Sequence, residues 1–345
     1  MADFNVNHIT GKQGQQGTVL AGVTTVSSTS AMRIPSGPTE QRGGRGRMVL
    51  MGGYGNSPAN SAQTQIQYLT IATTGNTSDF GDMRETRYVP AVCASSTRGI
   101  AAGGDATPSP ASDYRSSIDY VTIPSQGGAS EFGSLSVGNA YAVGLSDSTR
   151  GIIAGGNPPA MINLIEYVTI ASTGDTSNFG DLTVGRGNCA SCASPTRGIV
   201  FGGHRPSDSR DIIEYVTIAT RGDAIDFGNL QNGSRQGAGL SNTTRGIHAG
   251  GITPTYFNVI SYITISTLGD AIDFGDLIAA AGWLGSGASS TRGIWAGAYT
   301  PGANTNVIQY VTIASTGNTT DFGDVTGPAL IGLGGLTDVH GGLGD

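Results

Sequence analysis

Residues 165–182 read Ile-Glu-Tyr-Val-Thr-Ile-Ala-Ser-Thr-Gly-Asp-Thr-Ser-Asn-Phe-Gly-Asp-Leu, and variants of this stretch recur along the chain. The string Tyr-Val-Thr-Ile, or a near match, begins at intervals of 47 to 52 residues: Tyr68, Tyr120, Tyr167, Tyr215, Tyr262 and Tyr310. A Gly-containing turn follows each string, and then a Phe-Gly pair: Phe80, Phe132, Phe179, Phe227, Phe274 and Phe322. The copies cover residues 45–325 without a gap, and a fixed period of this length indicates a repeat architecture.

Two further motifs precede each string. A short apolar run ends in a doublet of small residues: Gly52-Gly53, Gly103-Gly104, Gly155-Gly156, Gly202-Gly203, Gly250-Gly251 and Gly297-Ala298. Before that run stands an arginine, within Thr-Arg-Gly in all copies but the first: Arg47, Arg98, Arg150, Arg197, Arg245 and Arg292. The whole unit, and not one motif, is therefore repeated.

Each repeat predicts four short β-strands. Residues 165–170 are β-branched and aromatic, residues 199–201 are apolar and closed by glycines, and residues 188–193 alternate small and polar side chains. The Thr-Gly-Asp turn at 173–175 offers a glycine that can take a positive φ. Four strands in roughly 50 residues is typical of a propeller blade. We predict an all-β fold, a six-bladed β-propeller with an extended N-terminal arm.

The composition excludes several classes of protein. The 345 residues include 56 Gly without the period of collagen, and 37% hydrophobic residues are enough for a packed core. The net charge of −7 argues against general nucleic-acid binding, because phosphates are neutralised by basic surfaces. No apolar stretch approaches the roughly 20 residues that span a bilayer, so membrane insertion and signal-directed secretion are disfavoured. Three cysteines cannot form a disulfide framework.

The sequence divides into two parts. Residues 1–44 lie outside the repeat and are predicted to form an arm that attaches the chain to another subunit or to its own copies. A disordered leader is the alternative for this segment. Residues 45–345 are predicted to form the propeller, and residues 329–336 align with the innermost strand of a further copy. We therefore predict that the C-terminal strand completes the first blade.

The repeat resembles the kelch repeat, which has an apolar run, a Gly-Gly doublet, a variable loop, a strand with Tyr and then an aromatic residue. It departs from kelch in having Phe where Trp is usual and a longer interval from Tyr68 to Phe80. The repeat is also similar to virion structural proteins of tailed phages, especially phages of marine bacteria and cyanobacteria. Residues 22–42 resemble the N-terminal attachment stretch of phage tail-fibre proteins. These resemblances imply a virion location, other virion structural proteins as partners and multiple copies in each particle.

Several motifs suggest chemistry but fit an architectural role. The Asp-Phe-Gly triplets recur with the period and lack the other kinase motifs. The carboxylates Asp270, Asp273 and Asp276 suggest Ca²⁺, although Asn in their place in other copies favours turn capping. The repeated arginines predict bonds to carboxylates or carbonyls of neighbouring segments, with an anion-binding ring as the alternative. Cys189 and Cys192 lack a second pair of zinc ligands, so no metal or cofactor is predicted.

The loops after the small-residue doublets vary most, and we expect them on one face of the propeller. They span residues 54–65, 105–117, 157–164, 204–212, 252–259 and 299–307. They carry aromatic and planar polar groups suited to sugars or a protein partner. The candidate binding residues are Tyr54, Asp113, Tyr114, Arg115, His204, Arg205, Tyr256, Phe257 and Tyr299. Loops that merely tolerate variation are the alternative.

The leading functional hypothesis is a non-enzymatic phage virion structural protein, which forms part of the capsid or neck or is a tail appendage or decoration protein. The alternative is a host-surface glycan-binding or receptor-recognition module. A propeller enzyme, such as a copper radical oxidase or a glycosidase, is a third hypothesis. It would need a His, Tyr and Cys constellation or an acidic pair outside the repeat, and the sequence offers neither convincingly.

Overall fold

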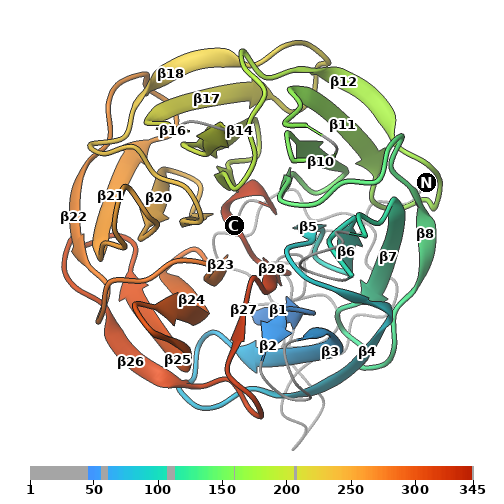
Figure 1. The fold of residues 1–345 in the computed structure, drawn as a ribbon, viewed down its shortest axis with the longest axis horizontal. Helices are drawn as coiled ribbons and strands as arrows, with labels where there is room; N and C mark the ends of the chain where they lie inside the picture. Colours follow the sequence, from blue (N-terminus) through green and yellow to red (C-terminus); the bar gives the residue numbers. More distant parts are fainter. Residues whose placement is uncertain (1–45, 56–60, 107–112, 159, 206–207, 344–345) are drawn as a thin grey trace, which may run out of the picture. The chain divides into compact units, whose positions relative to one another are not determined.

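The computed structural model describes residues 46–55, 61–106, 113–158, 160–205 and 208–343. Six antiparallel sheets of the described residues surround a common axis and form a six-bladed β-propeller, and a separate two-stranded sheet lies in one of the loops (Figure 1). The predicted all-β propeller is thus confirmed. The predicted arm, residues 1–44, lies outside the described residues.

In the second to sixth blades, the two inner strands flank the Thr-Arg-Gly turn, whereas in the first blade they come from the two ends of the repeat region. The innermost strands are, from the first blade to the sixth, β28 (Gly334–Thr337), β5 (Ala91–Ala94), β9 (Val143–Ser146), β13 (Ala190–Ala193), β19 (Ala238–Ser241) and β23 (Gly285–Ala288). The second strands are β1 (Arg47–Met51), β6 (Arg98–Ala102), β10 (Arg150–Ala154), β14 (Arg197–Phe201), β20 (Arg245–Ala249) and β24 (Arg292–Thr300). The innermost strands are rich in Ala, Gly and Ser, because the blades converge at the axis.

The two outer strands of each blade carry the Tyr-Val-Thr-Ile string and the Phe-Gly pair. The third strands are β3 (Ser61–Thr70), β7 (Ser117–Thr122), β11 (Leu164–Thr169), β17 (Ile212–Thr217), β21 (Val259–Thr264) and β25 (Ala303–Thr312). The outermost strands are β4 (Ser78–Arg87), β8 (Ser130–Ser134), β12 (Ser177–Asp181), β18 (Ile225–Asn229), β22 (Ile272–Asp276) and β26 (Thr320–Asp324). Four further short elements are β2 (Tyr54–Gly55), β15 (His204–Arg205), β16 (Asp208–Ser209) and β27 (Leu330–Ile331).

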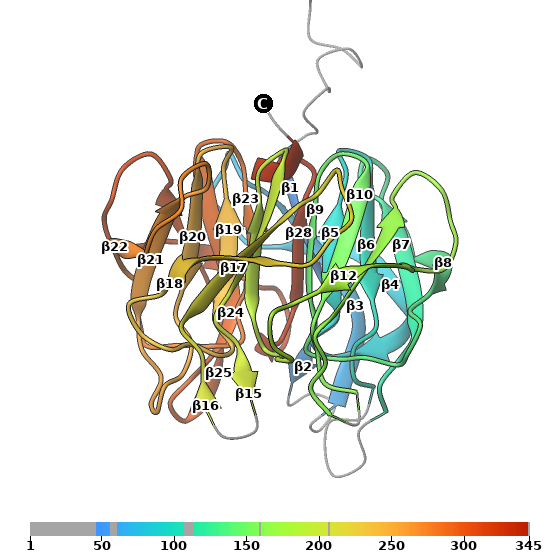
Figure 2. The same cartoon turned by 90° about the horizontal axis from the view of Figure 1, so that it is seen from above.

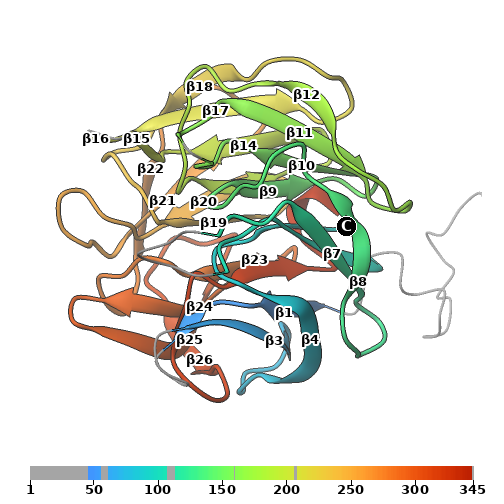
Figure 3. The ribbon, with the colours of Figure 1, turned by 45° about the vertical axis from the view of Figure 1, so that its right-hand side comes forward.

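The two ends of the repeat region meet in the first blade. Strand β28 pairs antiparallel with β1, and Met48 lies opposite Thr337. The same sheet is extended by β2 and β27. Figure 3 shows β1, β3 and β4 beside the sixth blade of β24, β25 and β26. Residues 329–336 therefore supply the innermost strand that the alignment of the repeats assigned to them.

The hydrophobic core lies between neighbouring blades. One cluster joins Val49, Met51 and Phe80 of the first blade to Val121 and Ile123 of the second. Within each blade, the ring of the repeated Tyr meets the edge of the repeated Phe, with ring centroids 5.8–6.2 Å apart. Burying each large apolar side chain is worth roughly 1.5–3 kcal/mol, so the repeated positions stabilise every interface in the same way.

The propeller has two different ends (Figure 2). We call the end with the Thr-Arg-Gly turns and the Thr-Gly-Asp turns the turn face. We call the opposite end, which carries β2, β15 and β16, the loop face. The variable loops begin there, as predicted, although residues 56–60, 107–112, 159 and 206–207 of these loops lie outside the described residues.

Burial of one histidine predicts a pH-dependent stability. His248 of β20 is 3% exposed, and burial lowers its pKa to about 4. The unfolded chain, with a pKa of about 6.5, therefore binds this proton more tightly than the folded chain does. We expect stability from this group to be complete above pH 6.5 and to be lost as the pH falls towards 4, by about 3 kcal/mol in total.

Calorimetry of the parent chain and of His248→Val between pH 7 and pH 4 measures this effect. Valine is the residue at the same position of the fourth blade, Val200. The variant should lose less stability than the parent as the pH falls. Equal losses in the two proteins would contradict the assignment to His248.

Candidate functional site

The repeated arginines on the turn face join neighbouring blades. Each donates from its guanidinium to the backbone oxygen of an isoleucine in the next blade, at 2.6–2.9 Å: Arg47 to Ile123, Arg98 to Ile170, Arg150 to Ile218, Arg197 to Ile265, Arg245 to Ile313 and Arg292 to Ile71. Each guanidinium also lies 4.3–4.9 Å from the ring centroid of the repeated tyrosine. The predicted Arg-to-carbonyl bonds are confirmed, and we assign these arginines to the architecture rather than to an anion-binding ring.

The polar side chains of the Gly-containing turns also join blades. Their Oδ1 atoms accept backbone N–H bonds from the outermost strand of the preceding blade, at 2.8–3.0 Å: Asn76 from Asp324, Asp175 from Ser134, Asp223 from Asp181, Asp270 from Asn229 and Asn318 from Asp276. The sequence favoured caps local to one turn, but the caps cross to the neighbouring blade. Among the described residues, no group of three or more His, Cys, Asp or Glu side chains could hold a metal ion.

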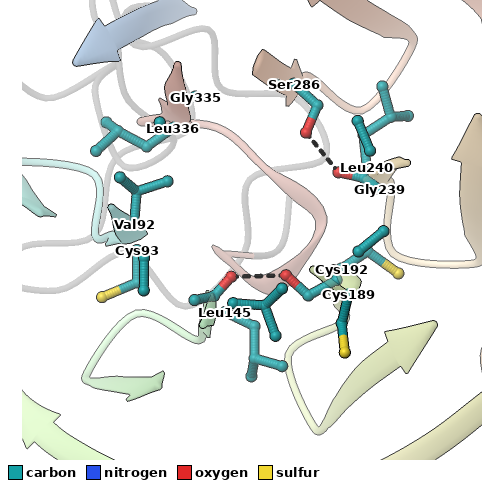
Figure 4. Close-up of a pocket in the computed structure, with 18 of the residues that line it drawn as sticks. Val92, Cys93, Leu145, Cys189, Cys192, Gly239, Leu240, Ser286, Gly335 and Leu336 are labelled. Carbon is teal, nitrogen blue, oxygen red and sulfur yellow. Dashed lines mark hydrogen bonds between the residues drawn. The ribbon is translucent and has the colours of Figure 1, made fainter. Parts of the chain in front are cut away.

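A narrow pocket of about 190 Å³ runs along the axis between the innermost strands (Figure 4). Cys93, Cys189 and Cys192 are among its lining residues, and Ser286 donates a hydrogen bond to the backbone oxygen of Gly239 across its wall. Burial raises the pKa of the Cys93 and Cys192 thiols to about 12. These thiols are therefore protonated at neutral pH, which suits packing and not nucleophilic chemistry.

The C-terminal residues close the turn-face end of this pocket. His340 lies with Nε2 3.0 Å from the backbone oxygen of Ala94 and 3.3 Å from Oγ of Ser146, while its Nδ1 accepts from the N–H of Gly342. Burial lowers the pKa of His340, so the imidazole is neutral at neutral pH. A short 3-10 helix, Gly341–Leu343, follows directly.

Six residues form a ring at the loop-face end of the pocket, one before each innermost strand. We call them the mouth ring: Val89, Tyr141, Asn188, Gln236, Trp283 and Gly332. All have a left-handed backbone, with φ between 47° and 63°. Five of their N–H groups donate to the carbonyl of the preceding ring member at 2.8–3.0 Å: Val89 to Gly332, Asn188 to Tyr141, Gln236 to Asn188, Trp283 to Gln236 and Gly332 to Trp283. These bonds tie the blades together around the opening.

Aromatic rings gather around one side of the mouth ring. Tyr88, which is 6% exposed, packs against Trp283 with centroids 5.5 Å apart and against Tyr141 at 6.2 Å. The loops add four of the predicted residues to this group: Tyr54 beside Tyr88, Tyr114 beside Tyr141, and Tyr256 and Tyr299 beside each other. We call these seven residues the aromatic cluster. Burial raises the pKa of Tyr141 to about 12, so its hydroxyl is a neutral donor.

The other side of the mouth ring is polar. Asn188 and Gln236 belong to the ring itself, and the backbone of His204 pairs with Gly187 beside Asn188. Burial lowers the pKa of the His204 imidazole, and the positive charge of Arg235 adds to this shift. Near this opening, an aromatic surface thus faces neutral hydrogen-bonding groups, which is the usual composition of a small-molecule site.

The remaining predicted residues lie apart from the mouth ring. Arg115 forms ion pairs with Asp113 at 3.2 Å and with Glu85 at 3.4 Å, so its charge is already compensated. Arg205 pairs through its backbone with Asp208 in a small hairpin. Among the described residues, Phe257 contacts no other aromatic ring. The structure therefore brings together Tyr54, Tyr114, Tyr256 and Tyr299, and leaves Asp113, Arg115, Arg205 and Phe257 outside the cluster.

Sequence reasoning missed the centre of this site. Tyr88, Tyr141 and Trp283 lie in connections between blades and not in the variable loops. The repeat alignment could have revealed the ring, because each mouth-ring residue stands four positions before the residue that aligns with Cys93. The position was not noticed because its six side chains differ in size and polarity.

Two buried arginines behind the mouth ring were also missed. Arg87 and Asp119 form a pair at 3.3 Å, and Arg186 and Glu214 form a pair at 2.9 Å, with all four side chains buried. Each arginine lies two residues before a mouth-ring residue. These pairs hold the connections that present Val89 and Asn188.

Comparison with protein-family models and with curated protein sequences gives no match to this chain. Within the described residues, no helix has the length and apolar character needed to cross a bilayer.

Proposed function

We propose that this protein is a non-enzymatic structural protein of a tailed-phage virion. Residues 1–44 attach the chain to the particle, and the propeller displays its loop face. The proposal is supported by the resemblance of the repeat to kelch-like and phage virion proteins and by the tail-fibre-like stretch at residues 22–42. Many copies on one particle would let weak contacts act together.

The observation that carries this proposal is the difference between the two faces. On the turn face, the repeated arginines and polar turn residues make the same bond in copy after copy, which is what a rigid scaffold needs. On the loop face, the copies differ and aromatic rings from several blades meet at the axis. A rigid body with one variable, aromatic end is suited to display and recognition.

A second candidate function is recognition of a host-surface glycan. The aromatic cluster favours it, because sugar rings present apolar C–H faces that pack on aromatic side chains while their hydroxyls bond to neighbouring polar groups. This function is compatible with the first, since a displayed virion protein could be the part that contacts the host.

Incorporation into particles tests the structural function. A phage whose gene for this chain is deleted infects cells that express either the full chain or residues 45–345. The resulting particles are purified and analysed by mass spectrometry. We expect the full chain in the particles and residues 45–345 in the unassembled fraction. Particles that contain neither protein, with the full chain soluble in the lysate, would contradict a virion role.

A further inference from the structure

The mouth ring keeps side chains where the backbone favours glycine. A left-handed φ is taken freely by Gly and less readily by other residues, and for β-branched or bulky residues it is a marked outlier. Gly332 shows that glycine is accepted in the ring, yet Val89, Tyr141, Gln236 and Trp283 occupy equivalent positions. Side chains that persist in strained conformations are concentrated at binding sites.

Two of these side chains have an unsatisfied acceptor. Asn188 Oδ1 and Gln236 Oε1 are buried and have no hydrogen-bond partner within the described part of the chain. Both residues line the axial pocket, as do Tyr141 and Trp283. Exchanging the amide oxygen and nitrogen would leave a donor without a partner instead, so each amide can take one more hydrogen bond in either orientation.

The pocket has a neutral lining. None of the described residues that line it is Asp, Glu, Lys or Arg, and its one histidine, His340, has a lowered pKa. A charged ligand would lose its hydration here without gaining a counter-charge. A neutral ligand with several hydroxyl groups and an apolar face matches both the amides and the aromatic rings.

We propose that the mouth ring binds one neutral sugar residue of a glycan. Its apolar face packs on Trp283 and Tyr141, and its hydroxyls bond to the amides of Asn188 and Gln236. The proposal rests on the glycan-recognition function above and assigns its site. Because residues 340–343 close the turn-face end, the sugar enters from the loop face. The pocket volume of about 190 Å³ holds on the order of ten water molecules, which suits one sugar residue and not a chain.

The two tryptophans allow a direct test. Trp283 lies in the mouth ring and is partly exposed, whereas Trp295 is fully buried in the core between blades. Intrinsic fluorescence of the full chain is titrated with the methyl glycosides of glucose, galactose, mannose and N-acetylglucosamine, and the labelled protein is applied to a glycan array. We expect a saturable change with at least one glycoside at millimolar concentration. Trp283→Phe removes the source of this signal, so its binding is measured on the glycan array, where we expect it to be weaker than that of the parent.

Gln236→Gly separates binding from folding. It removes one amide and relieves the left-handed strain, so we expect at least a tenfold weaker affinity together with a Tm that is unchanged or higher. Ile225→Ser is the matched control, because Ile225 is exposed on the outermost strand β18, where Ser78, Ser130 and Ser177 occupy the same position. This control should bind as the parent does.

Either of two results would overturn the sugar site. One is a parent protein that responds to no glycoside and to no array glycan. The other is undiminished binding by both Gln236→Gly and Trp283→Phe. Neither result affects the incorporation of the chain into particles, so failure of the sugar site and failure of the virion role are distinguishable.

Discussion

Deletion of residues 327–345 is expected to abolish cooperative folding of the propeller. This segment supplies β28, the innermost strand of the first blade, and buries Leu330, Ile331, Leu333 and Leu336. Burial of four such side chains is worth on the order of 6–12 kcal/mol, which is comparable to the entire stability of a typical domain. The deletion also leaves β1 as an unpaired edge inside the ring. Thermal unfolding followed by circular dichroism measures the effect.

A shorter truncation provides the control for this deletion. Removal of residues 341–345 leaves β28 in place, and the helix that it removes contributes only Gly341, Gly342 and Leu343 from the described residues. We expect a cooperative transition within a few degrees of the parent. If the chain without residues 327–345 melted at the parental temperature, closure of the ring by β28 would be wrong.

Gly228→Ala is expected to destabilise the propeller by about 3 kcal/mol or more. Gly228 is the glycine of a Phe-Gly pair, and an added Cβ would overlap the backbone oxygen of Gly269 in the next blade. The same close approach recurs in the other copies, for example between Gly81 and Gly127. The neighbouring atoms belong to backbone that is itself bonded across the interface, since Gly269 N–H donates to the oxygen of Phe227 at 2.9 Å.

Gly269→Ala is the matched control for Gly228→Ala. Both glycines have a φ of about 150° and they lie at the same interface, but nothing is within 4 Å of the position that a Cβ would take at Gly269. The difference in the free energy of unfolding between the two variants therefore measures the effect of the steric overlap without that of the backbone strain. Urea unfolding of each variant gives these two free energies. Equal destabilisation would mean that close packing at this glycine does not hold the blades together.

The repeat made the fold predictable because each of its motifs occupies the same structural position in every blade. The Tyr-Val-Thr-Ile string lies on the third strand, the Phe-Gly pair on the fourth, and Arg197 and its equivalents in the turn between the first two. A structural role that all copies share can be recognised from a single sequence, because the six copies can be aligned with one another. The bonds from these arginines to carbonyls of the next blade were predictable for the same reason.

The candidate site was predicted only in part, because its residues act through backbone conformation and long-range pairing. Nothing in the sequence around Trp283 or Tyr141 indicates a left-handed φ, which is unusual for these residue types. Arg87 and Asp119 meet across 32 positions of sequence at a place where the copies differ. By contrast, Tyr54 and Tyr299 were found because they lie in variable loops. Sequence variation among the loops identified the loop face, but it did not identify the mouth ring at the centre of that face.

The proposed virion role is tested most directly by reconstruction of tailed-phage particles assembled in the presence of this chain. We predict that residues 1–44 are buried against another virion subunit and that the loop face, with the aromatic cluster and mouth ring, points away from the particle. A propeller whose loop face is buried against the particle, with the turn face outward, would contradict the proposal that this face is displayed for recognition.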